Sequence, residues 1–357
     1  REKALDQIER VHWVPDWGKN RIQAMVKDRP DWCISRQRVW GIPIPAFFCQ
    51  SCGNTVMTEE TLSHLIPLVE REGTDIWFEQ PPEKLLPAGF RCPHCGGKDL
   101  KKEEDIMDVW IDSGSSFESV MASDPELGFP ADLYLEGSDQ HRGWFQSSLF
   151  LSVAKRGIAP FKEVITHGFI RDGKGIKMSK SIGNVILPQE IYAKYGAEIL
   201  RLWVATADYR NDINLSMDIV LQQVDVYKKI RNTIRFLLGN LSDFNPETDA
   251  VPYSQLSSFD RWALSRLSGL NEAVTESYNA FEFYKGIQTI NKFVITDLSS
   301  VYLDILKDRL YVEGKESHSR KSSQTVLMEI LKTLTLLLAP ILTFTSEEVY
   351  QFFPVSA

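Results

Sequence analysis

Two features common in nucleic-acid-binding and membrane proteins are missing from this sequence: an excess of basic residues and a long apolar run. Its 40 Lys and Arg residues are outnumbered by 48 Asp and Glu residues, giving a formal net charge of −8. This charge excludes a chain that is basic throughout, as histones are. The most apolar run, residues 331–344, contains Lys332 and Pro340 and is shorter than the roughly 20 residues of a membrane-spanning helix. Any nucleic-acid-binding surface must therefore be local, and no membrane partner is expected.

The sequence also lacks an initiator methionine, a signal peptide, internal repeats and low-complexity tracts. It starts at Arg1, and no basic stretch followed by an apolar one opens it. Hydrophobic residues make up 43% and charged residues 25%, the proportions of ordinary globular domains. A length of 357 residues suits two or three domains of roughly 100–200 residues each. We expect a folded, monomeric, cytoplasmic chain cut from a longer one.

An odd number of cysteines argues against a framework of disulfides. Four of the five fall into two Cys-x-x-Cys pairs, each followed by glycine; these four are Cys49, Cys52, Cys92 and Cys95. Four thiolates suit a tetrahedral structural Zn²⁺ ion. A redox pair is the alternative, but neither pair opens a thioredoxin-like βαβ unit. His94 is an alternative ligand whose place between two cysteines favours a solvent-facing position, and Cys33 is expected to be a small buried residue.

The chain divides by composition and apolar pattern into three regions, 1–107, 108–218 and 219–357. The first is rich in Trp, Pro, Gly and Cys with little sustained helical period, which indicates an irregular inserted module. The second alternates short apolar runs with a helical pattern, namely strands at 133–135 and 163–166 and a helix at 144–155. Strands separated by helices predict βαβ units and a parallel sheet.

The last region follows the period of helices. Apolar residues recur at three- and four-residue steps in four stretches, 219–238, 259–280, 281–306 and 326–338, with a loop at 312–323. A helical bundle is the simplest packing for such segments. The predicted fold class is therefore α/β with a parallel sheet, followed by an all-α bundle.

The sharpest local signal is the string Lys177-Met178-Ser179-Lys180-Ser181. Two ammonium groups three residues apart, bracketed by glycines and small hydroxyl residues, predict a mobile loop that meets polyphosphate oxygens as negative charge moves. The alternative is a solvated lysine loop, which an arbitrary Lys-x-x-Lys pattern would favour. The whole string resembles the signature lysine loop of class I aminoacyl-tRNA synthetases.

A second dense cluster of polar side chains spans residues 134–145, Tyr-Leu-Glu-Gly-Ser-Asp-Gln-His-Arg-Gly-Trp-Phe. It follows a predicted strand and opens a predicted helix, where parallel α/β sheets bind ligands, and Ser138 or Asp139 is suited to cap that helix. The alternative takes Asp139 and Gln140 as a helix cap only and His141 as a surface residue. The string resembles the segment that cradles the adenylate in isoleucyl-tRNA synthetases.

Four further stretches carry the same resemblance over nearly the whole chain. They lie at 31–45, 108–115, 203–213 and 227–240. The first resembles the return from the editing insertion to the catalytic domain of these enzymes. The last favours the isoleucine enzyme over its valine and leucine relatives.

The resemblance implies a division of the chain. Residues 1–107 would hold the return segment and a zinc-bearing insertion, 108–218 the C-terminal half of a Rossmann-like nucleotide-binding domain, and 219–357 an anticodon-binding helical bundle. The family's His-x-Gly-His turn is absent, since none of the six histidines forms that spacing. We therefore expect a fragment that lacks the N-terminal half with that turn, the editing domain and the C-terminal end, and that makes little adenylate alone.

The resemblance also implies roles for single residues. Lys177 and Lys180 would be catalytic, stabilising the α-phosphate and the departing pyrophosphate. Trp110 and Trp144 would wall the isoleucine side chain, and Glu136 would hold its ammonium group. The ATP and adenylate contacts would be Glu136, Gly137, Asp139, Gln140, His167 and Lys180.

Lys228, Arg231 and Arg235 are spaced at i, i+3 and i+7, which places them on one helix face. Such a ridge suits a phosphate backbone, and the alternative is a solvated helix face. Residues 219–357 contain 14 Lys and Arg against 16 Asp and Glu. A tRNA contact at this ridge therefore rests mainly on the family resemblance.

The implied activity is ATP-dependent activation of isoleucine, followed by transfer to tRNA(Ile). The implied cofactors are a structural Zn²⁺ ion and the Mg²⁺ that accompanies ATP. Three alternatives stay open: a fragment of a valyl- or leucyl-tRNA synthetase, a non-catalytic tRNA-binding paralogue, and a purely structural zinc protein.

Overall fold

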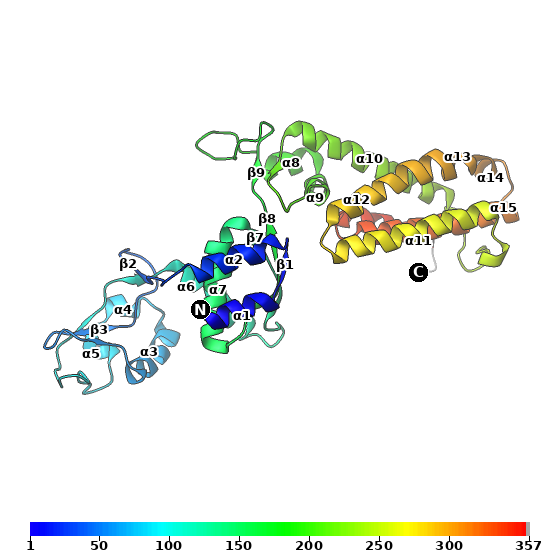
Figure 1. Cartoon of the computed structure of the whole chain (residues 1–357). Coiled ribbons are helices and arrows are strands. Elements are labelled where there is room, and N and C mark those ends of the chain that lie inside the picture. Colours follow the sequence, from blue (N-terminus) through cyan, green and yellow to red (C-terminus); the bar gives the residue numbers. More distant parts are fainter. Residues whose placement is uncertain (355–357) are drawn as a thin grey trace. The chain divides into compact units, whose positions relative to one another are not determined.

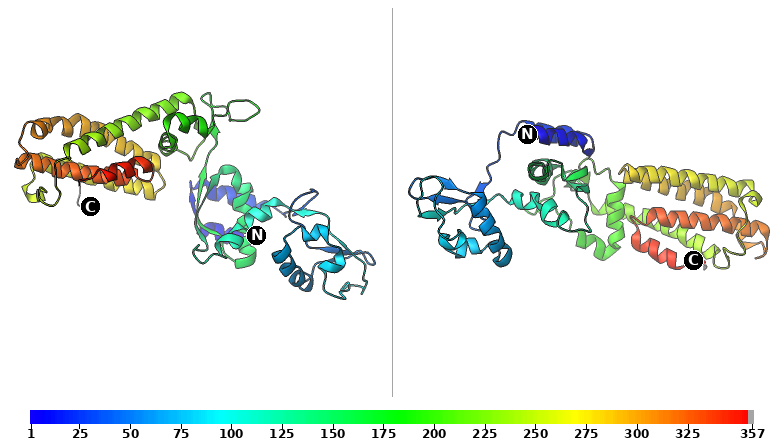
Figure 2. Two further views of the ribbon diagram at one scale, coloured as in Figure 1. Left: turned by 180° about the vertical axis from the view of Figure 1, so that it is seen from behind. Right: turned by 90° about the horizontal axis from the view of Figure 1, so that it is seen from below.

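A computed structural model describes residues 1–354 and divides the chain into two compact units, Arg1–Thr166 and a second that begins at His167. Figures 1 and 2 show the elements of each unit. Both the α/β part and the all-α part predicted from the sequence are present. Within residues 1–354, no helix is both long enough and apolar enough to cross a membrane.

The first unit is built on a three-stranded sheet with the order β1-β8-β7. Its strands are β1 (His12–Val14), β7 (Ala131–Gly137) and β8 (Phe161–His167). β1 runs parallel to β8, with Trp13 opposite Val164, so strands far apart in the sequence are neighbours. The strands predicted at 133–135 and 163–166 and the helix predicted at 144–155 are confirmed as β7, β8 and α7 (Trp144–Arg156).

Two helices that the sequence did not predict complete the core of this sheet: α1 (Glu2–Arg10) and α2 (Trp17–Lys27). Ala4 and Ile8 of α1 are four residues apart and buried, as are Ile22 and Val26 of α2, so each pair lies on one helix face. The prediction that the first region lacks sustained helices is wrong here. Helices of only 9 and 11 residues barely fill the window of about 11–18 residues over which helical periodicity is recognised.

The chain enters and leaves the cysteine-rich insertion through one two-stranded ribbon, in which β2 (Ser35–Arg36) pairs antiparallel with β6 (Ile106–Met107). Within the insertion, β3 pairs antiparallel with both β4 and β5. Buried Trp77, Phe47 and Leu85 belong to its core. Its elements are β3 (Phe47–Cys49), β4 (Thr55–Val56), α3 (Glu59–Glu72), α4 (Ile76–Glu79), α5 (Pro82–Leu85) and β5 (Leu100–Lys102).

The second unit starts with a small subdomain that carries the lysine motif. β9 (Ile170–Arg171) pairs parallel with β10 (Ile213–Asn214). Helices α8 (Pro188–Tyr195) and α9 (Ala197–Thr206) pack with the start of the next helix around buried Ile191 and Trp203. The lysine motif lies in the turns between β9 and α8.

The rest of the second unit is a helical bundle with a single large apolar core. Its helices are α10 (Met217–Asn240), α11 (Ser258–Asn279), α12 (Phe283–Lys292), η4 (Phe293–Tyr302), α13 (Leu303–Ile305), α14 (Lys307–Tyr311), α15 (His318–Leu338) and α16 (Thr343–Gln351), with the short η3 (Tyr253–Gln255) before α11. The four helical stretches predicted from the sequence are confirmed as parts of these elements.

Two predicted helix ends are wrong. Helix α10 runs through Asn240 instead of ending before Gly239, and Asn240 Nδ2 donates to the Phe236 carbonyl at 2.9 Å in its last turn. Helix α15 begins inside the loop predicted at 312–323, because the Ser317 hydroxyl accepts from the backbone amide of Arg320 and caps the helix there.

Candidate functional site

The four paired cysteines converge on one point of the insertion. Their Sγ atoms all lie within 4.8 Å of one another, with 3.6 Å between Cys49 and Cys95 and 3.7 Å between Cys52 and Cys92. A tetrahedron of thiolates at the Zn–S distance of 2.3 Å has edges of about 3.8 Å. The sulfurs are therefore placed to share one metal ion, and they are too far apart for disulfides.

The surroundings of the sulfurs also suit thiolate ligands. Hydrogen bonds from the backbone and side-chain amides of Asn54 lower the pKa of Cys52 to about 6. The backbone amide of Gly97 acts in the same direction on Cys95, but the neighbouring sulfurs of Cys52 and Cys49 outweigh it and raise the pKa of Cys95 to about 12. An ionised thiolate thus opposes ionisation of its neighbour by charge repulsion, and a bound cation would remove that repulsion.

Two expectations about the remaining candidates have different outcomes. His94 is exposed, in agreement with a solvent-facing position, and it is not part of the sulfur cluster. Cys33 was expected to be buried, and this is wrong: it is exposed, with its sulfur near the carbonyl and hydroxyl oxygens of Ser35. Its position beside the β2–β6 ribbon, outside any core, explains the exposure.

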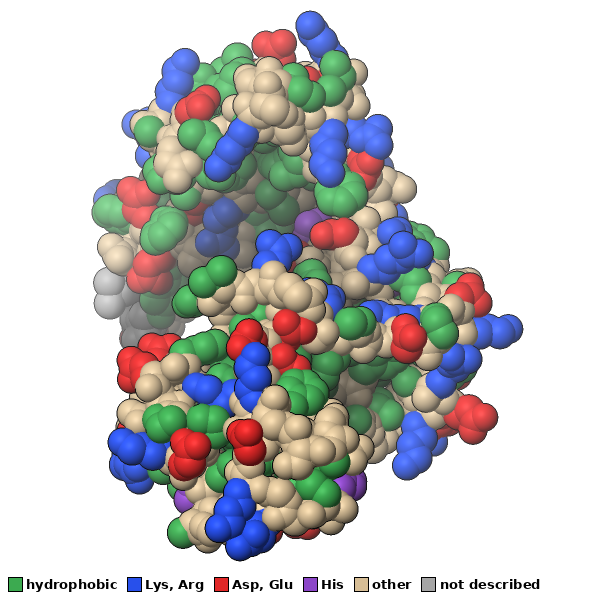
Figure 3. Space-filling model, turned by 90° about the vertical axis from the view of Figure 1, so that its left-hand side faces the viewer, with side chains coloured by type: hydrophobic (Ala, Val, Ile, Leu, Met, Phe, Trp, Pro, Cys, Tyr) green, Lys and Arg blue, Asp and Glu red, His purple; other side chains and the backbone are tan. Residues whose placement is uncertain are grey.

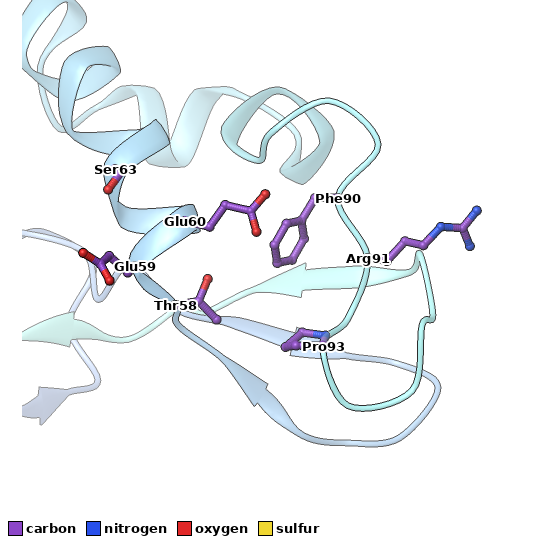
Figure 4. A pocket seen from close by; sticks show the side chains of 7 residues that line it. All are labelled: Thr58, Glu59, Glu60, Ser63, Phe90, Arg91 and Pro93. Atoms are coloured by element: carbon purple, nitrogen blue, oxygen red, sulfur yellow. The ribbon is translucent and has the colours of Figure 1, made fainter.

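A hollow of about 560 Å³ lies beside the cysteine cluster, between the start of α3 and the segment that leads into the second cysteine pair (Figure 4). Glu59, Glu60 and Arg91 in its wall are exposed. None of the residues predicted to bind ATP or isoleucine lines it. The hollow therefore adds nothing to the predicted chemistry.

The predicted adenylate segment forms a strand, a tight turn and a helix. Glu136 is exposed near the end of β7, and its carboxylate accepts from the Gly137 amide at 2.9 Å. The turn itself is η2 (Ser138–Arg142), a 3₁₀ helix. The prediction that Ser138 or Asp139 caps α7 is wrong. Gln140 caps the helix instead. Its Oε1 accepts from the Trp144 amide at 2.8 Å, and the 3₁₀ turn brings the two residues within reach.

His141 lies at the centre of this turn and is fully buried, which corrects its interpretation as a surface residue. Its Nδ1 is 3.0 Å from the Ser138 carbonyl oxygen, and a carbonyl only accepts, so Nδ1 carries the hydrogen. Burial lowers the pKa of His141. Its Nε2 atom has no partner among the described residues. The side chain is thus a neutral imidazole that fixes the turn from inside.

Gly18 of α2 makes room for this histidine. A Cβ atom at Gly18 would lie 3.2 Å from His141 Nε2 and 3.8 Å from the Thr166 hydroxyl, which is also buried without a partner in the described part of the chain. The rings of Trp17, Trp13 and Phe145 surround the imidazole, with centroids 5.4–6.1 Å away. The sequence signal for this arrangement was only a glycine in the first turn of a short helix.

The two tryptophans predicted to wall an isoleucine pocket lie near one another. A Cβ at Gly143 would come within 2.8 Å of the Trp110 indole and 2.5 Å of Gln140 Oε1, so Trp110 sits against the turn that leads into Trp144. Trp144 is half-buried and donates from Nε1 to the Ser113 carbonyl at 2.9 Å. The structure therefore brings Trp110, Gln140 and Trp144 together beside the end of β7.

Asp108 is a residue whose importance the sequence did not reveal. It is 4% exposed and caps α6 (Val109–Gly114), the helix that carries Trp110, by accepting from the Trp110 amide at 3.1 Å. The same carboxylate accepts from the Trp32 indole at 3.0 Å and from Arg36. Asp108 therefore connects the segment around residue 32 to the helix that carries Trp110.

The lysine motif forms its own cluster in the second unit. Both Lys177 and Lys180 are exposed. Lys177 Nζ lies 4.6 Å from the centroid of the Phe169 ring, a cation–π contact, whereas Lys180 makes no ion pair within residues 1–354. His167 is half-buried at the end of β8, with Nδ1 2.8 Å from the Gly168 carbonyl. Two exposed ammonium groups three residues apart are available to an anion.

The basic ridge is present on α10. Lys228, Arg231 and Arg235 are all exposed, and none of them forms an ion pair in the part of the chain that the structure describes. By contrast, basic and acidic side chains are interspersed on the face of the molecule drawn in Figure 3. The ridge also has an acidic neighbour, because the exposed Asp225 lies three residues before Lys228 on α10.

Comparisons with known families agree with this arrangement. Residues 1–216 match the family described as "tRNA synthetases class I (I, L, M and V)", and residues 260–357 match the "Anticodon-binding domain of tRNA ligase". The first match alone covers more than half of the chain. It contains the cysteine cluster, the turn predicted to bind the adenylate and the lysine motif.

Curated relatives are similar over the whole chain. Proteins named isoleucine–tRNA ligase are 62% identical in Kosmotoga olearia, over 100% of this chain, 59% in Petrotoga mobilis and 58% in Thermotoga maritima, each over 98% of it. The chain spans only 38–39% of the length of these relatives.

Solved structures share the fold. A LeuRS from Agrobacterium radiobacter K84, in a ternary complex with tRNA and LeuAMS, is 26% identical with a TM-score of 0.66, covering 91% of this chain and 41% of that one. A methionyl-tRNA synthetase from Mycobacterium tuberculosis bound by methionyl-adenylate is 17% identical with a TM-score of 0.68, covering 98% of this chain and 60% of that one. The chain belongs to the class I tRNA synthetase family that comprises the I, L, M and V enzymes.

Proposed function

We propose that the full-length protein activates isoleucine with ATP and transfers it to tRNA(Ile), and that this chain supplies part of the adenylation site and part of the tRNA-binding surface. The observation that carries the proposal is the naming of relatives 58–62% identical over 98–100% of the chain as isoleucine–tRNA ligases. In the reaction, a carboxylate oxygen of isoleucine attacks the α-phosphorus of ATP, and the bond from that phosphorus to pyrophosphate breaks.

The turn after β7 is the proposed binding site for the adenylate. Glu136 offers a carboxylate to the substrate ammonium group, while Gly137, Asp139 and Gln140 line the ribose and phosphate. The Gln140 side chain is held at both ends, because its Oε1 accepts from the Trp144 amide and its Nε2 donates to Asp139 Oδ2 at 3.3 Å; Nε2 keeps one further hydrogen to donate to a ligand. Support comes from the position of the turn at the carboxyl end of a strand in a parallel sheet.

The proposed amino-acid pocket is walled by Trp110 and Trp144. Both indoles offer apolar faces to a branched hydrocarbon side chain. An apolar pocket separates isoleucine from valine by only about 150-fold, a ratio established for isoleucyl-tRNA synthetases themselves. These two side chains therefore favour branched aliphatic substrates without singling out one of them.

Lys177 and Lys180 are the proposed catalytic residues, and His167 is proposed to face the nucleotide. Preorganised positive charge stabilises the negative charge that moves from the α-phosphate to pyrophosphate in the transition state. Mg²⁺ would accompany ATP as part of the substrate complex. No covalent nucleophile is needed, because positioning and charge stabilisation supply the catalysis.

Zn²⁺ is the metal proposed for the four cysteines. The sulfur spacing, the all-thiolate donor set and the absence of an open ligand position among four cysteines suit a structural zinc site. When bound, the ion would cross-link β3, the turn after it and the second cysteine pair. Its role would be to hold the insertion folded.

The ridge of Lys228, Arg231 and Arg235 is proposed to contact the phosphates of tRNA(Ile).

We further propose that the full-length protein is a cytoplasmic monomer. The three-part division at residues 107 and 218 is retained as a proposal about domain function: return segment with zinc-bearing insertion, catalytic half-domain and anticodon-binding bundle.

Isoleucine-dependent exchange of pyrophosphate into ATP by the full-length protein tests the proposal. Exchange that depends on isoleucine supports it, and exchange that depends instead on valine or leucine would assign the protein to one of those enzymes. The absence of exchange with every branched amino acid would contradict the proposed enzyme activity and favour a non-catalytic tRNA-binding paralogue.

A further inference from the structure

The lysine loop is held in a defined shape by two side chains outside the five-residue motif. Asp172 donates from its backbone amide to the Ile176 carbonyl at 2.8 Å, closing a short turn in which Gly175 has a φ of +79°. Arg171 and Lys177 form a β-bridge on either side of this turn. The chain therefore enters the motif as a hairpin.

Asp172 braces the inside of the hairpin. Its Oδ1 accepts from the backbone amides of Lys174 and Ile176, each at 2.9 Å. Its Oδ2 accepts from Asn184 Nδ2, also at 2.9 Å. The Asn184 hydrogen bond is the largest of several that lower the pKa of Asp172, so the carboxylate is ionised at neutral pH.

Asn184 continues the brace into the motif itself. Its Oδ1 accepts from the Ser179 amide at 2.9 Å, and its Nδ2 also approaches the Lys177 carbonyl at 3.3 Å. Asn184 thus holds the backbone on both sides of Met178, whose side chain packs against the apolar core of the same subdomain. The backbone is fixed at Lys177 and at Ser179, immediately before Lys180.

We propose that Asp172 and Asn184 are positioning residues that set where the two ammonium groups of the lysine loop lie during adenylate formation. This inference rests on the proposed function. The physical reason is that an exposed lysine has high rotational freedom, and a fixed backbone on both sides of Met178 restricts the volume that each ammonium group samples. Positioning of charge is then preorganised before ATP arrives.

The donor and acceptor pattern allows a reciprocal test. Asp172→Asn alone places an amide against the Asn184 amide, and Asn184→Asp alone places two carboxylates together. The double variant Asp172→Asn/Asn184→Asp restores one donor facing one acceptor, keeps the acceptors for Lys174, Ile176 and Ser179, and leaves the net charge unchanged. The double variant does not restore the weaker contact to the Lys177 carbonyl at 3.3 Å, because a carboxylate oxygen replaces the donor there.

Hydrogen exchange of the full-length protein without substrates provides the readout that does not depend on activity. Each single variant should raise exchange at the Lys174, Ile176 and Ser179 amides about tenfold, as expected for losing about 1.4 kcal/mol of hydrogen bonding. The double variant should restore exchange to within about threefold of the unmodified protein. Unchanged exchange in both single variants would overturn the claim that the hydrogen bonds of Asp172 and Asn184 hold the loop backbone.

Isoleucine-dependent pyrophosphate exchange provides the second readout. Asn184→Ala should lower kcat at least about tenfold while the KM for isoleucine changes less than about twofold, since the brace acts on charge placement in the transition state. Gln189→Ala removes an exposed amide of α8 that makes no side-chain hydrogen bond within residues 1–354; it is the matched control and should behave like the unmodified protein. Faster hydrogen exchange in Asn184→Ala with unchanged kcat would overturn the positioning role. No activity in the unmodified protein would instead contradict the proposed function, and with it the catalytic part of this proposal.

Discussion

The indole of Trp144 lies flat on the phenol ring of Tyr134, with 4.1 Å between the ring centroids and 7° between the planes. Tyr134 comes from β7 and Trp144 from the first turn of α7, so the stack closes the turn between them. Burial raises the pKa of Tyr134 to about 12, so its ring remains neutral. The geometry of the proposed adenylate turn therefore depends on an aromatic contact at its base.

Trp144→Ala should remove both this stack and one wall of the proposed pocket. We expect a loss of about 3 kcal/mol in the free energy of unfolding, together with a raised KM for isoleucine. Urea denaturation and pyrophosphate exchange measure the two effects. Trp262→Ala is the control, because Trp262 stacks on Phe259 within the helical bundle: it should lower stability without changing the KM. A Trp144→Ala protein with an unchanged KM would remove this residue from the pocket.

Gly18→Ala should destabilise the first unit. The added Cβ would crowd His141 Nε2 at 3.2 Å, and the crowded atom belongs to a ring that is buried among other aromatic rings. We expect a loss of about 1–3 kcal/mol, the usual cost of overpacking a core, measured by urea denaturation. Gly128→Ala meets nothing within 4 Å and should change stability by less than about 0.5 kcal/mol. Equal stabilities of the two variants would contradict the packing described around His141.

The stability of the protein should fall as the pH drops below about 6.5, the usual pKa of an unfolded histidine. Burial, aided by Arg21, lowers the pKa of His141 in the folded state, while the Ser138 carbonyl and Asp139 act in the opposite direction. The unfolded chain therefore binds this proton at a higher pH than the folded one, and stability is lost between the two pKa values. His141→Gln should flatten this slope in denaturation curves from pH 5 to pH 8, whereas His94→Gln, at an exposed site, should not. Equal slopes for His141→Gln and the unmodified protein would argue against a buried neutral imidazole.

Metal analysis tests the cysteine cluster. We expect one zinc ion per chain, and its loss in Cys49→Ser, because Cys49 is one of four converging sulfurs and its removal leaves only three ligands. Loss of the ion should also unfold the insertion, since structural zinc binding is coupled to folding. Cys33→Ser, at an exposed cysteine outside the cluster, should keep the zinc. A folded protein without metal would reject the assignment.

Sequence patterns predicted those parts of the molecule in which one physical signal dominates. β7, β8 and α7 were predictable because apolar runs and helical period are strong there, and the cysteine cluster because four thiolates in two pairs have few other uses. Helices α1 and α2 were missed because, at 9 and 11 residues, they are short for recognition by helical periodicity. Of the two caps named in the alternative interpretation, Asp139 and Gln140, only Gln140 contacts the start of α7, because a 3₁₀ turn separates the strand from the helix.

Site residues whose role depends on tertiary contacts were also beyond the reach of the sequence. His141 is polar and lies in a polar string, yet three aromatic rings from separate elements bury it. Asp172 and Asn184 are twelve residues apart and look like ordinary loop residues, but they hydrogen bond directly. Such pairs follow from the folded path of the chain and leave no local pattern.

Pyrophosphate exchange by the full-length protein, measured with isoleucine, valine, leucine and methionine and repeated with Lys180→Ala, tests both the proposed substrate and the proposed catalytic lysine. Exchange should be fastest with isoleucine. In Lys180→Ala its kcat should fall about 100-fold or more, the order of loss seen when a transition-state donor is removed, with little change in the KM for isoleucine. Exchange that prefers another amino acid would contradict the proposed substrate, and exchange that is unaffected by Lys180→Ala would contradict the proposed catalytic lysine.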